Sequence, residues 1–413
     1  MVTLRPITRA LVPVDSNAAV RLSAPNYDEF QSDKEIWDLL QERPDNILRV
    51  TMAHCHTDDL ANAVEEGGEE SLKHAGEQMQ DVINGDLTRE VPNLLYVYEI
   101  TSPKRPEAPQ IGVGGYAASN EIRTEENPKG TIVRNEGIRP EKADGRARLI
   151  NATNSYIGTV NLCVQDKSKN LTNELVRISQ SRACDFEAKD EADNLHRVWL
   201  VTDEAEQKHL ISILAHEPAA YVADGNHRSA AAAALGKDNF LTVFFPTARL
   251  GLEPYNRLLP RNGVSTEALL EQVAEHFDVK PHVSNEAYRP ESVHQIGLYI
   301  DGQWCELIPK EDSYDPSNAA QSIDSDIVQR HIIDGILGMS DARDKRINYV
   351  GGNKPTSYLV ERVDAGDYDL AISLAPVTMA QFVEVCEQNL FMPPKSTWFD
   401  PKIRSGLVIA LLD

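Results

Sequence analysis

The run YVADGNHRS at residues 221–229 combines residue types that can hold an anion. Its apolar start predicts a short buried strand, and Asp224-Gly225 predicts a tight turn, because glycine accepts a positive φ or a close backbone approach. The alanine run that follows predicts a helix that ends at Gly236. The first turn of a helix presents unpaired N–H groups and a partial positive charge, so this turn predicts an anion site.

His227 and Arg228 fall in the first turn of that helix, where the helix dipole disfavours positive charge. Two cations at that position are explained if they face a negatively charged ligand. We therefore expect Gly225, Asn226, His227, Arg228 and Ser229 to bind phosphate. A second interpretation stays open, in which Asp224 is only a helix N-cap and the two bases lie on the surface.

Lys395 is the most unusual lysine of the chain, because two prolines fix the backbone before it and hydroxyl residues follow it. It is predicted either to bind a phosphate or carboxylate or to cap the final strand. Tyr27 and Asp28 are predicted either to line a substrate pocket or to form a turn after Pro25. The turn is slightly favoured. Arg257 would lie near Asp224 if the strands that carry them are neighbours.

His54 and His56 flank Cys55, and this spacing could ligate a metal ion. The chain has no second pair of ligands at a metal-binding spacing. A polar loop is therefore the favoured interpretation of this segment.

The run at residues 221–229 resembles the DGHHR element of the domain of unknown function 1015 family, with Asn226 in place of the first His. The stretch MPPKSTWFDPK at 392–402, with RSGL at 404–407, is similar to the family signature MPPKSTWFxPKxxSGL almost letter for letter. Shorter matches in family order are APNYD (24–28), PDN (44–46), LYVY (95–98), YNR (255–257) and RINYVGG (346–352). The chain is thus identified as a member of that family over essentially its whole length.

One family motif departs from its usual form. The family typically has HExT followed by RPxKxxDR, and residues 135–142 here read NEGIRPEK, followed by Gly145-Arg146. Glu136 retains the acidic residue of the HExT motif, and Lys142 and Arg146 retain basic residues of the RPxKxxDR motif. Asn135, however, replaces the histidine. Asparagine cannot exchange protons near pH 7, so any role that needs an imidazole at position 135 or 226 is lost. The departures indicate a diverged member.

More remotely, the DGHHR element resembles the nucleotide-binding motif of the ParB/sulfiredoxin superfamily, which includes free serine kinases. This resemblance implies a nucleotide-dependent kinase for a small hydroxylated metabolite, possibly free serine, with ATP or ADP and Mg²⁺. Glu136 would be the general base, and Asp224 would hold Mg²⁺ or the acceptor. The implied pocket residues are Tyr27, Asp28, Arg146, Arg257, Lys395 and Ser396.

Two other functions stay open beside the kinase. A non-catalytic nucleotide- or phosphate-binding regulator is favoured by the asparagine replacements. A ParB-like DNA-binding protein is disfavoured, because the formal net charge of −23 repels nucleic acid and no basic helix-turn-helix is evident.

The elements that must position these residues follow from the apolar pattern. Strands are predicted at 94–100, 111–117, 156–164, 198–202, 221–223 and 240–245, and helices at 147–154, 171–178, 204–214 and 227–235. Their alternation predicts an α/β fold with a mixed sheet, in which a ParB/sulfiredoxin-like core is embedded in a larger chain. Polar breaks at 127–130 and 260–263 predict an N-terminal α/β lobe (1–125), a central core with the DGNHR motif (126–260) and a C-terminal α/β lobe (261–413).

The composition indicates the cellular compartment and the classes of partner that we expect. The 413 residues are enough for a sizeable core, and five scattered cysteines without a CxxC predict thiols in a reducing compartment. Neither a signal peptide nor an apolar run of membrane-spanning length is evident. We expect a soluble cytoplasmic protein that binds a nucleotide and a small molecule and has neither nucleic acid nor membrane as a partner. The sequence does not determine the oligomeric state.

Overall fold

The computed structural model describes residues 1–30, 32–284, 286–342 and 344–412, the side chain of Asp28 excepted. Its contacts divide the chain into two compact units. Unit 1 consists of residues 1–134, 138–250 and 401–413, and unit 2 of residues 135–137 and 251–400. Each unit is described by itself.

Unit 1 is built on an 11-stranded sheet in the order β4-β9-β6-β10-β3-β2-β1-β19-β5, with β8 pairing β2 and β7 pairing β8. The pairs β4–β9 and β6–β10 are parallel and the others antiparallel, so the predicted mixed α/β class is confirmed. The strands are β1 (Ile7–Pro13), β2 (Thr88–Thr101), β3 (Gln110–Ala118), β4 (Ile132–Val133), β5 (Ser155–Tyr156), β6 (Val160–Val164), β7 (Phe186–Lys189), β8 (Leu195–Val201), β9 (Ala220–Asp224), β10 (Asn239–Pro246) and β19 (Ile409–Leu411).

The centre of this sheet is buried on both faces. All nine residues of β3 are buried, as expected for a strand that reads as one apolar run. Gly114 of β3 lies opposite Tyr96 of β2, and a Cβ at Gly114 would stand 2.0 Å from the Tyr96 ring. Glycine is required here because the aromatic ring occupies the place of the missing side chain.

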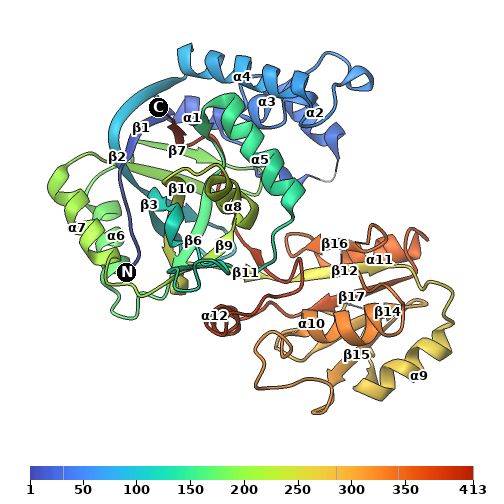
Figure 1. Cartoon of the computed structure of the whole chain (residues 1–413). Coiled ribbons are helices and arrows are strands. Elements are labelled where there is room, and N and C mark those ends of the chain that lie inside the picture. Colours follow the sequence, from blue (N-terminus) through green and yellow to red (C-terminus); the bar gives the residue numbers. More distant parts are fainter. Residues whose placement is uncertain (31, 285, 343, 413) are drawn as a thin grey trace. The chain divides into compact units, whose positions relative to one another are not determined.

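The helices of unit 1 are amphipathic and cover the sheet. They are α1 (Ser16–Leu22), α2 (Asp33–Glu42), α3 (Leu48–Thr51), α4 (Glu69–Asn84), α5 (Pro140–Thr153), α6 (Asn170–Ser181), α7 (Glu204–Leu214) and α8 (Asn226–Ala234). Short 3-10 turns are η1 (Tyr27–Glu29), η2 (Ala53–Cys55), η3 (Leu60–Asn62), η4 (Ser119–Glu121) and η5 (Thr247–Arg249). Figure 1 shows α5 between α4 and α8, and it packs against both.

Two predicted elements have different bounds in the structure. The helix expected at 147–154 begins at Pro140, because proline at the first helical position has the right φ and lacks only an N–H that would be unpaired there. The strand expected at 156–164 is two strands, β5 and β6, separated at residues 157–159. Gly158 lies in that break, and a Cβ there would stand 3.0 Å from Cδ of Arg228.

Unit 2 holds a six-stranded sheet in the order β13-β15-β14-β17-β12-β16 and a separate pair, β11–β18. Leu269 of α9 packs on one face of the sheet and Leu359 of α11 on the other, so both faces are buried. The strands are β11 (Leu252–Glu253), β12 (Tyr255–Leu259), β13 (Phe277–Pro281), β14 (Ile296–Ile300), β15 (Gln303–Pro309), β16 (Asn348–Gly351), β17 (Leu370–Leu374) and β18 (Trp398–Phe399). The helices are α9 (Thr266–His276), α10 (Asp324–Val328), η6 (Gln329–Asp334, a π-helix), α11 (Thr356–Asp364) and α12 (Met379–Glu387).

The C-terminal stretch 401–413 is an integral part of unit 1. Strand β19 lies between β1 and β5, and Gln110 donates a 2.8 Å hydrogen bond to the carbonyl of Pro401. The guanidinium of Arg404 is buried, where it donates to the Ser23 carbonyl at 3.0 Å and pairs with Glu191 at 2.9 Å. The second half of the family signature is therefore built into the sheet and core of unit 1.

All five cysteines are thiols in the structure, as predicted. Cys184 and Cys305 are half-buried, whereas Cys55, Cys163 and Cys386 are buried. We expect a thiol reagent to label all five in denatured, unreduced protein, and only the first two at an appreciable rate in the native protein, because the reagent must reach the sulfur. Mass spectrometry of labelled peptides measures this, and fast native labelling of Cys386 would contradict it.

Among the described residues, no helix combines the length and apolar character that a membrane crossing requires.

Candidate functional site

The predicted strand, turn and helix at residues 220–234 are present as β9, Gly225 and α8. Gly225 is the N-cap of α8 and has φ 101°, a conformation that favours glycine. A Cβ at this position would also stand 3.0 Å from Nε of Arg228. Glycine is therefore needed both for the backbone conformation and for the close approach of Arg228.

Arg228 turns back over this junction. Its Nη2 donates to Oδ2 of Asp224 at 2.6 Å, and its Nη1 donates to the carbonyl of Thr159. Asp224 is therefore engaged in an ion pair, and it is not the N-cap of α8. Ser229 is fully buried, and its hydroxyl donates to the carbonyl of Asn226, which is itself buried.

The first turns of α5 and α8 meet at His227. The backbone N–H of Arg139, the N-cap of α5, donates to Nε2 of His227 at 3.1 Å. Burial, followed by the positive charges of Lys142, Arg139 and Arg146, lowers the pKa of His227 to about 4. His227 is therefore neutral at pH 7, with its proton on Nδ1, and it stands within a group of cations. We call Arg139, Lys142, Arg146 and Arg228 the cationic cluster.

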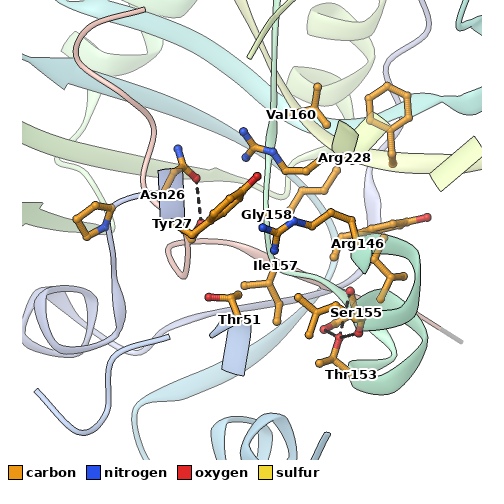
Figure 2. Close-up of a pocket in the computed structure, with 17 residues that line it drawn as sticks. Asn26, Tyr27, Thr51, Arg146, Thr153, Ser155, Ile157, Gly158, Val160 and Arg228 are labelled. Atoms are coloured by element: carbon orange, nitrogen blue, oxygen red, sulfur yellow. Dashed lines mark hydrogen bonds between the residues drawn. The ribbon is translucent and has the colours of Figure 1, made fainter. Parts of the chain in front are cut away.

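A cavity of about 60 Å³ lies beside Arg228. The guanidinium of Arg146 stacks on Tyr27, 3.8 Å from its ring centroid. Figure 2 shows the guanidinium groups of Arg146 and Arg228 directed to the side on which Tyr27 lies. The structure thus brings together Tyr27, Arg146 and Arg228, which the sequence analysis placed in different motifs.

A second cavity, of about 540 Å³, shares Tyr27 and Arg146 with the small one. Lys142 and Arg148 add positive charge to its lining. Its acidic lining residues are Asp33, Glu66, Glu141 and Asp144. The stacked pair of Arg146 and Tyr27 therefore forms part of the wall of both cavities. The larger one has the volume of a typical small-molecule site.

Two family motifs from opposite ends of the chain meet at the small cavity. The amide of Asn26 donates to the carbonyl of Ile403 at 3.1 Å, and the hydroxyl of Ser405 lies 3.4 Å from Oδ1 of Asn26. Asn26 and Ser405 both line the cavity. Tyr27 is held by η1, which Asn26 caps in a capping box. The side chain of Asp28, also predicted at the pocket, lies outside the described part of the chain.

The remaining predicted residues belong to unit 2. Glu136 is half-buried and lines neither of the two described cavities. Arg257 is fully buried in β12, where its guanidinium stacks 4.6 Å from the Tyr349 ring centroid and burial lowers its pKa to about 10. Lys395 Nζ lies 3.2 Å from the Tyr255 hydroxyl, and Ser396 Oγ accepts from Ser325 Oγ at 2.8 Å. Their predicted contribution to a ligand pocket stays a prediction.

Sequence reasoning missed Arg139 and Arg148. The available signal was the Arg-Pro pair at 139–140, since proline at the start of a helix marks the residue before it as the N-cap. It also missed Asp33, which the structure places beside His54.

The low pKa of His227 makes stability depend on pH. The histidine binds a proton in the unfolded chain below its ordinary pKa of 6.5, but in the folded chain only near pH 4. The free energy of unfolding therefore falls as the pH drops from about 6.5 to about 4, with a limiting slope of about 1.4 kcal/mol per pH unit for one proton. We expect His227→Gln, which can still accept from Arg139, to reduce this slope in urea unfolding.

His216→Gln is the matched control, because His216 is exposed to solvent and its Nδ1 lies 2.6 Å from the carbonyl of Ser212 in α7. It should leave the pH dependence as in the wild type. Equal slopes in wild type and His227→Gln would contradict the assignment of a neutral, proton-excluding His227.

The chain is similar to a known family of proteins. The family model described as "Protein of unknown function (DUF1015)" matches residues 4–331. No curated protein matches the chain at a significant level.

Similar solved structures have low identity and low TM-scores. A free serine kinase in complex with AMP is 10% identical over 65% of this chain and 83% of that one, with a TM-score of 0.36. SbnI with a C-terminal truncation from Staphylococcus aureus is 11% identical over 71% and 85%, with a TM-score of 0.40. A conserved hypothetical protein from Pyrococcus furiosus is 11% identical over 67% and 92%, with a TM-score of 0.35. These TM-scores are too low to support an argument about function.

Proposed function

Because the chain belongs to the DUF1015 family, several of whose motifs line the small cavity, we propose that the protein binds a nucleotide and transfers its phosphate to a small hydroxylated metabolite. The observation that carries the proposal is the cationic cluster. Arg139, Lys142 and Arg146 act electrostatically on His227, at which the first turns of two helices meet. Arg228 is the next residue and pairs with Asp224, in a chain of net charge −23. Such a chain repels anions in general, so a local group of donors of this kind is what an anionic ligand needs.

The larger of the two adjoining cavities has the volume of a small-molecule site, whereas the small one does not. Positioning and charge neutralisation do most of the work in phosphoryl transfer, and arginine suits both tasks because its fork of donors matches phosphate oxygens. Arg146 lines both cavities, so it could contact a phosphate that passes between them. We assign the nucleotide to the cavity of about 540 Å³ and the transferred phosphate to the side of Arg146 and Arg228.

The catalytic roles proposed for Asp224 and Glu136 rest on the motif resemblance. Asp224 offers a carboxylate, and Mg²⁺ in nucleotide sites is held by one or two carboxylates together with the phosphates. Arg228 contacts Oδ2 of Asp224, and a carboxylate has a second oxygen for a metal ion. The role of Glu136 as the general base rests on its place in the family's HExT motif.

The test has two parts, binding and turnover. Calorimetry with ATP, ADP and AMP should detect binding. The affinity should be lower at high salt, because salt screens the ion pairs between the protein and the phosphates. Phosphorus NMR of the protein with ATP or ADP, Mg²⁺ and a panel of amino and hydroxy acids should detect a phosphorylated acceptor. Absence of nucleotide binding would overturn the proposal as a whole.

A non-catalytic nucleotide- or phosphate-binding regulator is the second candidate. It is favoured by the ion pair between Asp224 and Arg228, because the positive charge of Arg228 weakens the attraction of the carboxylate for a metal ion. Asn135 and Asn226 also remove the two imidazoles of the family motifs. Nucleotide binding without a phosphorylated product from any acceptor would select this function over the kinase.

A further inference from the structure

Three potential metal ligands meet at the wall of the larger cavity. Nε2 of His54 lies 3.4 Å from Oδ2 of Asp33 and 3.3 Å from Sγ of Cys55. The three ligand atoms all lie within 4.8 Å of one another. Asp33 and His54 line the cavity, while Cys55 is fully buried.

Two of the three separations are those expected at a metal site. Ligand atoms at about 2.0–2.3 Å from a tetrahedral metal ion are about 3.3–3.7 Å apart, and both contacts of Nε2 lie in or at the edge of this range. The ligand atoms of Asp33 and Cys55 lie within 4.8 Å of each other. Nε2 carries at most one proton, so it cannot donate to both the carboxylate and the sulfur. A shared cation instead satisfies all three groups at once.

The backbone holds the ligands in place. Ser32 caps α2, and this cap fixes Asp33 at the first position of the helix. His54 and Cys55 belong to η2, where the N–H of Cys55 donates to the carbonyl of Met52 at 2.9 Å. His54 is only 4% exposed, so its imidazole is held by packing. Asp33 is anchored through its backbone while its side chain is 56% exposed, so packing holds the side chains of His54 and Cys55.

His56, which follows Cys55, is not part of this group. Its Nδ1 lies 3.4 Å from Nε2 of His74 on α4. From the sequence alone a polar loop is the favoured interpretation of this segment, and Asp33, which is distant in sequence, is brought beside His54 by packing.

We propose that Asp33, His54 and Cys55 bind a divalent transition metal of the zinc class, with a fourth coordination position open to the cavity for water or a ligand atom. One thiolate, one imidazole and one carboxylate are ligand types that zinc accepts. Three protein ligands with one open position are typical of zinc sites that act on a bound ligand. Binding displaces the thiol proton of Cys55 to solvent, so one proton is released per ion. The inference is independent of the proposed phosphate transfer.

The test uses the full chain after treatment with a chelator. Titration with Co²⁺ should produce a thiolate-to-cobalt charge-transfer band, and Zn²⁺ should abolish it by displacement. Cys55→Ser should lose the band, and Asp33→Asn and His54→Gln should weaken Co²⁺ binding by about tenfold or more, since each removes one of the few ligands that hold the ion. Circular dichroism of the metal-free variants checks that each is folded.

Cys184→Ser and His74→Gln are the controls. Cys184 also lies near a carboxylate, with Sγ 3.9 Å from Oε2 of Glu187, and His74 belongs to the neighbouring histidine pair. Both should retain the band and the affinity. Lack of Co²⁺ binding by the wild type, a band that persists in Cys55→Ser, or a loss of binding in His74→Gln would each overturn the proposal.

Discussion

Replacing Arg228 by alanine should weaken nucleotide binding by about tenfold or more. Arg228 lines the small cavity and is held in place by Asp224 and the Thr159 carbonyl. Its guanidinium is thus pre-organised, and loss of charged hydrogen bonds to phosphate costs about 1.5–3 kcal/mol. The measurement is calorimetry with ATP or ADP on variant and wild type under the same salt conditions.

Arg182→Ala is a closely matched control for this substitution. Arg182 also pairs with a carboxylate, that of Glu206, and donates to a backbone carbonyl, that of Leu200. It lines neither cavity of unit 1 that is described above. The nucleotide affinity of Arg182→Ala should equal that of the wild type, and unchanged affinity in folded Arg228→Ala would remove this arginine from the site.

Replacing Glu136 by glutamine should reduce phosphate transfer by about 10²–10⁴ in rate, the usual effect of removing a general base. Glutamine keeps the size and hydrogen bonding of the side chain but cannot accept a proton. Nucleotide affinity should change little, so the loss appears in kcat. Initial rates of product formation followed by phosphorus NMR measure it.

Asp224→Asn and Glu125→Gln complete this experiment. Asp224→Asn should lose the Mg²⁺-dependent part of the activity, because an amide is a much poorer ligand for Mg²⁺ than a carboxylate. Glu125 is exposed and serves as the control, and its variant should have wild-type rates. Full activity in Glu136→Gln would exclude Glu136 as the base without affecting the binding proposal.

The fold of the central part was predictable where strands are apolar throughout. β3, β9 and β10 match the predicted runs to within one residue at each end, and α7 has the predicted bounds. β8, which includes a histidine and an arginine, begins three residues before the predicted run. The two-residue strand β4 was missed, and β5 was merged with β6 into one predicted strand, because so short a segment has no periodicity of its own. The division into three domains was drawn from polar breaks and stays a prediction, whereas the two units follow contacts between distant stretches.

The site was predictable only where one motif contains it. Gly225 and Arg228 lie in one run, and glycine before a helix with adjacent bases was a sufficient signal. The meeting of Tyr27 with Arg146 depends on how η1 and α5 pack, which no local pattern specifies. In the same way Asp33 reaches His54 only through tertiary packing.

Strand β19 has a consequence for synthesis on the ribosome. Unit 1 includes the first strand of the chain and the last, and β1 pairs directly with β19. The buried partners of Ser23 and Asn26, which are Arg404 and Ile403, are synthesised 381 and 377 residues after them. Unit 2, whose residues 251–400 are made before these partners, is able to fold first on the nascent chain. We therefore expect ribosome-bound chains that stop before residue 401 to expose the edge of β1 to chaperones.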